Sequence, residues 1–136
     1  MIKGKSFKPA TVVYLAGGMK SNWQDIVKKE FPEVVFFDPR DHNCKSEQEY
    51  TRWDLTGVEK CDIVFAFLEN SNPAGQGLCV EVGFARALEK YVIYLEEPRD
   101  NARYFGMCRV ISDFVSNEEN CLQAGITHLR ELLKSN

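Results

Sequence analysis

Short apolar runs alternate with helical patterns along the chain, and this alternation limits the fold more than any other feature. Each run is apolar at its centre, which is typical of parallel strands buried on both faces. The predicted strands are residues 11–16, 34–37, 62–67 and 91–95, with a weaker fifth at 110–115; the predicted helices are residues 21–31, a segment from Ser46, 78–90 and about 122–133. We therefore predict one α/β domain over residues 1–136, a flavodoxin-like or Rossmann-like three-layer sandwich around a parallel sheet of about five strands.

The carboxyl ends of the predicted strands show where a ligand would bind, because open parallel sheets hold ligands at that edge. The loops expected there are residues 17–21, 38–43, 69–77 and 96–99. Ser21 is the predicted N-cap of the first helix, and Pro32 closes that helix. Ser46 and Glu49 have the spacing of a capping box for the next helix.

Charge and cysteine content exclude several classes of protein. The chain has 17 basic and 20 acidic residues, so no basic groove for polymeric nucleic acid is expected, and a small ligand is favoured. No apolar stretch is long enough for a bilayer span, and residues 1–10 lack the apolar region of a secretory signal. Five cysteines without a CxxC pair argue against a zinc site or a disulfide framework and predict free thiols in the cytoplasm.

Glu81 is the first candidate for chemistry. It follows the third predicted strand and stands among apolar residues of a helix. Burying an unpaired carboxylate is costly, so a glutamate there should be paired, protonated or functional. The alternative is a glutamate on the solvated flank of the helix or one favoured by the helix dipole.

Asp54 and Tyr14 are the other two candidates. Asp54 lies one helical turn after Tyr50, which would place a second carboxylate beside a ring able to stack on a flat base. The alternative is a surface ion pair with Arg52 or Lys60. Tyr14, near the end of the first strand, could hold a carboxylate or a sugar hydroxyl, or could be a plain core aromatic.

Glycine-containing loops supply candidate binding segments. Gly17 and Gly18 allow a ligand close to the backbone, and residues 72–77 (NPAGQG) open the helix that carries Glu81, where N–H groups could face a phosphate or sugar oxygen or simply form a turn. Neither segment forms GxGxxG, so no dinucleotide cofactor is expected. His42 has no Ser or Cys partner at a familiar spacing, and His128 is predicted on a helix surface.

Four segments in order give the sequence a resemblance to a known family. Residues 13–18 (VYLAGG), 53–55 (WDL), 61–66 (CDIVFA) and 72–85 (NPAGQGLCVEVGFA) resemble the nucleoside 2-deoxyribosyltransferase family and its nucleotide N-hydrolase relatives. The resemblance spans roughly residues 11–95. It implies a flavodoxin-like fold, a homo-oligomer and a reaction that needs neither a metal nor an organic cofactor.

The resemblance also implies site residues. Glu81 matches the glutamate that attacks the anomeric carbon, Asp54 the aspartate that assists departure of the base, and Tyr14 the tyrosine that orients the nucleophile. The expected substrate-binding residues are Ala16, Gly17, Gly18, Asp38, Arg40, Trp53, Asn72, Gly75 and Gly77.

The sequence departs from the family pattern in two segments. Gly75 stands where the transferases have a base-reading aspartate, and Lys20 and Ser21 stand near the Ser and Arg of the phosphate-binding hydrolases, in a displaced register. Three hypotheses follow: a deoxyribosyltransferase acting on nucleosides and a free base, a nucleoside 5′-monophosphate N-hydrolase with water as acceptor, and a non-catalytic nucleotide-binding module.

Overall fold

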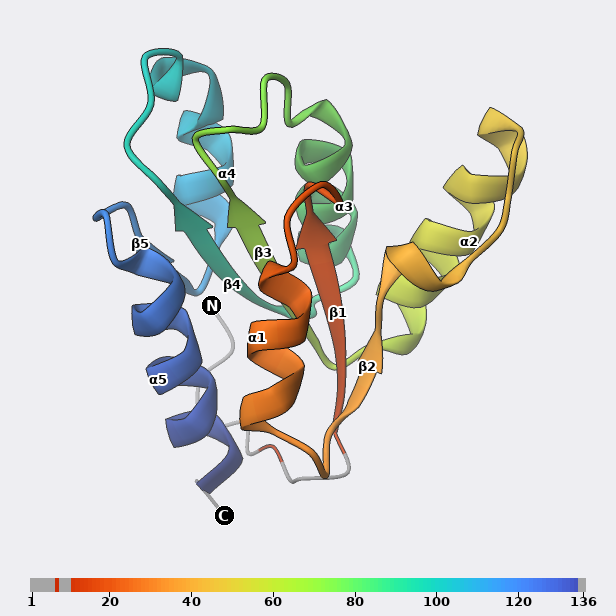
Figure 1. The fold of residues 1–136 in the computed structure, drawn as a ribbon, viewed down its shortest axis with the longest axis horizontal. Helices are drawn as coiled ribbons and strands as arrows, with labels where there is room; N and C mark the ends of the chain where they lie inside the picture. Colours follow the sequence, from red (N-terminus) through yellow and green to blue (C-terminus); the bar gives the residue numbers. More distant parts are fainter. Residues whose placement is uncertain (1–6, 8–10, 135–136) are drawn as a thin grey trace.

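The computed structural model describes residues 7 and 11–134 and contains one parallel sheet (Figure 1). Its strands lie in the order β2–β1–β3–β4–β5, and every neighbouring pair is parallel. The strands are β1 (Val12–Gly17), β2 (Val35–Phe37), β3 (Ile63–Leu68), β4 (Tyr91–Glu96) and β5 (Phe114–Ser116). This 2-1-3-4-5 order is that of flavodoxin-like folds, and the predicted fold class is confirmed.

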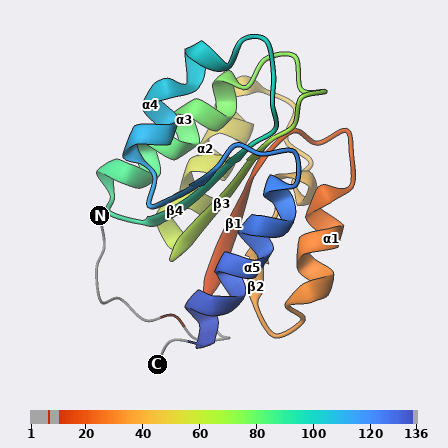
Figure 2. The ribbon, with the colours of Figure 1, turned by 90° about the vertical axis from the view of Figure 1, so that its left-hand side faces the viewer.

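Helices cover both faces of the sheet and make the three layers (Figures 1 and 2). One face carries α1 (Trp23–Glu30) and α5 (Cys121–Lys134), and the other carries α2 (Glu47–Lys60), α3 (Gln76–Ala87) and α4 (Gly106–Ile111). Alternate residues of each strand point to opposite faces. In β1, Val13 and Leu15 therefore pack with the α1–α5 core, while Tyr14 and Ala16 pack with the α2–α4 core.

The fifth strand was predicted too early in the chain. Residues 110 and 111 belong to α4, and β5 begins only at Phe114. Val110 is 82 % exposed because it sits on the outer side of this short helix rather than in the sheet. The helix ends where the Ser112 hydroxyl donates to the Cys108 carbonyl, and the Asp113 carboxylate then accepts from the Val92 N–H at the start of β4.

The helix starts were predicted with mixed success. Ser46 caps α2 as expected, since its hydroxyl oxygen accepts from the Glu49 N–H. Asn22, not Ser21, is the N-cap residue of α1, and the Ser21 hydroxyl donates to the Glu69 carboxylate. The first helix also ends at Glu30, and the third runs over Gln76–Ala87 rather than 78–90.

Within the described residues, no helix is long and apolar enough to cross a membrane. The expectation that residues 1–10 are not a secretory signal concerns a segment that, apart from Phe7, lies outside the described residues.

Candidate active site

Tyr14 and Glu81 meet between β1 and α3. The Tyr14 hydroxyl donates a hydrogen bond of 2.5 Å to Oε2 of Glu81. Tyr14 is fully buried because its position on β1 faces the α2–α4 layer, and Glu81 is 9 % exposed. A carboxylate in an apolar helix is thus given one strong donor from the neighbouring strand, so it can hold a charge in a setting that disfavours it.

Burial controls the protonation of both groups. Removal from water raises the pKa of Glu81 from an ordinary value of 4.5 to about 7; the Tyr14 hydrogen bond opposes this rise, and the nearby Asp54 carboxylate adds to it. The pKa of Tyr14 is raised by burial and by Glu81, so its hydroxyl stays a donor. Glu81 therefore changes charge near neutral pH, which is typical of groups that take part in chemistry.

Asp54 projects from α2 and has one buried oxygen. Burial raises the pKa of Asp54, while His42 lowers it. Oδ1 of Asp54 accepts no hydrogen bond from a described residue, and Nε2 of His42 lies 3.5 Å away from it. Nδ1 of His42 accepts from the Cys44 N–H, so a neutral His42 carries its proton on Nε2, the nitrogen that faces Asp54.

Asp54 and Glu81 line the same cavity, which we call the Glu81 cavity. Its volume is about 250 Å³, and its lining residues are Tyr50, Thr51, Asp54, Leu55, Gly77, Val80 and Glu81. The walls come from α2 and α3, the two helices that flank β1 on this face. Tyr50 and Asp54 share one side of α2, as their spacing predicts, so an aromatic ring and a carboxylate face the same space.

Two glycines hold the helices in this arrangement. Gly75 is the N-cap residue of α3 at φ +100°, and a Cβ there would lie 3.0 Å from side-chain atoms of Leu68 and Phe105. Gly57 lets α2 approach β1 and β2, because a Cβ there would lie 2.6 Å from the Phe37 ring and 2.8 Å from the Tyr14 ring. The close approach of α2 at Gly57 brings Asp54, nearly one turn earlier, toward Tyr14 and Glu81.

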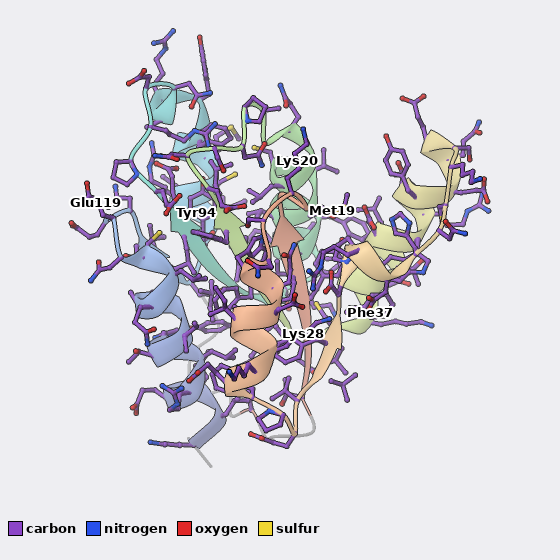
Figure 3. All side chains as sticks on the ribbon, viewed as in Figure 1. Met19, Lys20, Lys28, Phe37, Tyr94 and Glu119 are labelled. Carbon is purple, nitrogen blue, oxygen red and sulfur yellow. The ribbon has the colours of Figure 1, made fainter. Side chains whose placement is uncertain are left out.

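A second cavity lies at the carboxyl ends of β1 and β3, and we call it the Lys20 cavity. Figure 3 shows Met19 and Lys20 on the loop that follows β1. The cavity holds about 240 Å³ and is lined by Gly18, Met19, Lys20, Glu69, Ser71, Asn72 and Pro73. Two predicted binding residues, Gly18 and Asn72, are therefore in this cavity and not in the Glu81 cavity.

Arg99 fixes the loop that forms this second cavity. Its guanidinium donates to the carbonyl oxygens of Glu69 at 2.7 Å and Asn72 at 2.6 Å, and its plane lies over the Phe105 ring. The Glu97 carboxylate accepts from the Asn70 N–H. The loop after β4, expected at the binding edge, thus supports the loop after β3.

Asp38 and Arg40 belong to an ion network instead of a cavity. Asp38 is 1 % exposed and pairs with Arg40 and Lys28, each at 2.7 Å, while Arg40 also pairs with Asp25. Burial alone would raise the pKa of Asp38, but the hydrogen bonds from Arg40 and Lys28 outweigh it and hold that pKa below its ordinary value. Both charges already have partners, so the structure gives no support to their expected role in binding substrate.

Ala16, Gly17 and Trp53 also lie outside the Glu81 and Lys20 cavities. Ala16 is fully buried within the α2–α4 core, and a Cβ on Gly17 would collide with the Phe67 carbonyl oxygen. Trp53 packs edge-on against Phe37 and lines a cavity on another side of α2 from Asp54.

The match to known sequences covers most of the chain. Residues 13–123 match the family described as nucleoside 2-deoxyribosyltransferase. The chain belongs to the nucleoside 2-deoxyribosyltransferase family. As a member of this family it is an enzyme whose substrates are small molecules of the nucleoside and nucleotide class. No curated protein sequence matches it significantly.

Solved structures share the fold of this deoxyribosyltransferase-family chain. The CMP N-glycosidase of Clostridium botulinum has a TM-score of 0.63 at 23% identity, covering 88% of this chain and 98% of that one. The 2-deoxyribosyltransferase of Leishmania mexicana has a TM-score of 0.66 at 17% identity, covering 89% and 97%. The 2-deoxyribosyltransferase of Bacillus psychrosaccharolyticus has a TM-score of 0.58 at 20% identity, covering 80% and 88%.

Sequence reasoning missed His42 and Gly57 in this family member. His42 was set aside because it lacks a nucleophile partner, whereas its partner is the carboxylate of Asp54. A glycine inside a predicted helix is itself a signal of close packing, and Gly57 carried that signal. Among the described residues, no three His, Cys, Asp or Glu side chains gather as a metal-binding group.

Proposed function

We propose that this enzyme cleaves the N-glycosidic bond of a (deoxy)nucleoside and transfers the sugar to another base, with Glu81 as nucleophile. The observation that carries the proposal is that Glu81 and Asp54 line the same cavity, while the Tyr14 hydroxyl on β1 donates a hydrogen bond to Glu81. Two carboxyl groups facing one cavity are the arrangement that retaining glycosidic chemistry uses.

In the first step a carboxylate oxygen of Glu81 attacks the anomeric carbon. The carbon–nitrogen bond breaks, its electron pair goes to the base, and Asp54 supplies a proton that makes the base a better leaving group. In the second step a nitrogen of an incoming base attacks the same carbon and releases the Glu81 carboxylate. The proton that this nitrogen carried passes to Asp54. Tyr14 holds Glu81 in place through both steps.

The electrostatics support this division of roles. Burial raises the pKa of Glu81 to about 7, so the anionic form that can attack is accessible near neutral pH. The pKa of Asp54 is raised by burial, which favours the protonated form that a proton donor requires. The Tyr50 ring, 40 % exposed at the mouth of the cavity, offers a flat surface for a base.

Hydrolysis of a nucleoside 5′-monophosphate is the second candidate, and Lys20 is the observation that favours it. Lys20 lines the Lys20 cavity, and its positive charge would favour an anion there. Glu69 lines the same cavity and disfavours a phosphate, which is why we place the nucleoside first. If the monophosphate is the substrate, Lys20→Ala should lower kcat/KM on monophosphates and leave activity on nucleosides unchanged.

The test is a panel of nucleosides and nucleoside 5′-monophosphates, each incubated with and without a free base, followed by chromatography. New nucleosides formed only with added base support transfer, whereas free base released without an acceptor supports hydrolysis. Glu81→Ala should remove the activity, and Glu59→Gln, on the exposed side of α2, should not. Equal rates for wild type and Glu81→Ala would remove Glu81 from the mechanism.

We also propose that the enzyme works as a homo-oligomer. Val80 is 58 % exposed beside Glu81, and with Tyr50 it leaves apolar surface at the open mouth of the Glu81 cavity. A second copy that covered this mouth would exclude water from the site. Sedimentation equilibrium tests this directly, and a monomer at assay concentration would contradict it.

A further inference from the structure

Two cysteine sulfurs lie together between α3 and α4, and neither residue lines the Glu81 cavity. Sγ of Cys108 on α4 is 3.6 Å from Sγ of Cys79 on α3, although the residues are 29 positions apart. Cys79 is half-buried and lines a cavity of about 250 Å³. Its other lining residues are Pro73, Ala74, Gln76, Asn101, Tyr104 and Phe105. Cys108 is not among the lining residues and is only 5 % exposed.

We propose that Cys79 and Cys108 form an oxidation site, in which a small hydroperoxide entering this cavity converts the two thiols into a reversible disulfide between α3 and α4. The site is separate from the proposed catalytic groups. Cys79 and Glu81 are two positions apart on α3, so their side chains project to nearly opposite sides of the helix.

The burial of the two thiols sets the order of events. Burial, with the neighbouring Cys79 sulfur, raises the pKa of Cys108 to about 12, so Cys108 remains a thiol until its partner is oxidised. Cys79 is the sulfur that the cavity exposes, and it is therefore the one that the peroxide meets first.

The chemistry balances with the peroxide as the only oxidant. The Cys79 sulfur attacks one peroxide oxygen, the O–O bond breaks, and Cys79 becomes a sulfenic acid with release of water or an alcohol. The Cys108 sulfur then attacks the Cys79 sulfur, the S–O bond breaks, and the hydroxyl leaves as water with the Cys108 proton. Two thiols lose two electrons in total, and one peroxide gains them.

The geometry needs only a small adjustment. A disulfide has a sulfur–sulfur distance of about 2.05 Å, so the two sulfurs must approach by about 1.5 Å, within the reach of side-chain rotation. The bond would close a loop that contains β4 and the segment after it. Closing a loop of this length restricts the unfolded chain and stabilises the folded one.

The test treats the reduced full-length enzyme with a small excess of hydrogen peroxide, blocks remaining thiols with an alkylating reagent, and maps the peptides by mass spectrometry. We expect one linked peptide pair joining Cys79 to Cys108, two fewer free thiols than the five of the reduced protein, and full reversal by dithiothreitol. The unfolding temperature should rise by roughly 5–10 °C on oxidation and return on reduction.

Variants separate the pair from other cysteines. Cys79→Ser or Cys108→Ser should abolish the peroxide-induced rise in unfolding temperature, whereas Cys44→Ser, at the other half-buried cysteine, should keep it. Recovery of Cys79 and Cys108 as separate alkylated peptides from oxidised wild-type protein would overturn the proposal, and this outcome requires no variant to fold. Because the readouts are thiol chemistry and stability, they stand apart from the proposed transferase reaction.

Discussion

The Tyr14 hydroxyl donates to Oε2 of Glu81, although the two residues are 67 positions apart in the sequence. This hydrogen bond joins α3 to β1 at the point where the proposed chemistry occurs. Burial pushes the carboxyl toward its neutral form, and this one donor pushes it back toward the anion. In the proposed mechanism, the balance between these two effects decides what fraction of Glu81 is in the reactive, anionic form at a given pH.

Tyr14→Phe should move the acid limb of the pH–rate profile upward from near pH 7. Without the hydroxyl, burial acts unopposed and the pKa of Glu81 rises further. A hydrogen bond to a charged group contributes about 1.5–3 kcal/mol, so kcat/KM at pH 7 should fall by roughly tenfold or more. Tyr94→Phe is the matched control, because it removes a similar buried hydroxyl–carboxylate bond, to Glu96. An unshifted acid limb in Tyr14→Phe would contradict this prediction.

Glu81→Gln should be inactive yet more stable than wild type at alkaline pH. The pKa of Glu81 is raised on folding from 4.5 to about 7, so the wild-type carboxyl favours the folded state below pH 4.5, and this contribution is lost as the pH rises through 7. The neutral amide avoids that loss. Thermal unfolding at pH 5 and pH 8 should show a gain for the variant at pH 8 that is larger by on the order of 2 kcal/mol. A gain that is equal at both pH values would argue against a raised Glu81 pKa.

His42→Asn should shift upward the limb of the pH–rate profile that reflects Asp54. His42 lowers the pKa of Asp54 against the effect of burial, so its loss lets the Asp54 pKa rise and makes the group a weaker acid. The measurement is kcat/KM against pH, compared with His128→Asn, whose ring bonds to Tyr91 away from both cavities. If both limbs keep their positions, His42 does not act through Asp54.

Gly57→Ala should reduce activity more than its effect on folding would suggest. The added methyl would lie 2.6 Å from the Phe37 ring and 2.8 Å from the Tyr14 ring, so α2 must move away from the sheet and carry Asp54 with it. Overpacking of this kind costs about 1–3 kcal/mol in stability. We expect kcat to fall at temperatures well below unfolding, with circular dichroism confirming the fold. Gly83→Ala, where a Cβ has nothing within 4 Å, is the control.

The sheet was predictable because continuous apolar runs leave few other arrangements, and four of the five strands lie where the sequence places them within two residues. The fifth failed because Val110 and Ile111 have strand propensity but lie in a short helix packed beside α3. Tyr14, Asp54 and Glu81 could be chosen from the family resemblance and the cost of burying carboxylates. Whether Asp38 and Arg40 face a ligand or each other depended on Lys28 and Asp25, which local sequence does not reveal.

If the proposed transfer reaction holds, the attachment of α2 has a consequence for which bases the enzyme accepts. Gly57 and Val58 are buried against the rest of the protein, whereas residues 47–52 are exposed, and Figure 1 shows the amino-terminal part of α2 standing clear of the sheet. Asp54, the residue proposed to protonate the departing base, therefore lies on a helix that is packed against the sheet mainly around Gly57. The space between α2 and α3 for a one-ring or a two-ring base would then depend on the angle of α2 to the sheet. The orientation of this one helix would set the size of base that fits.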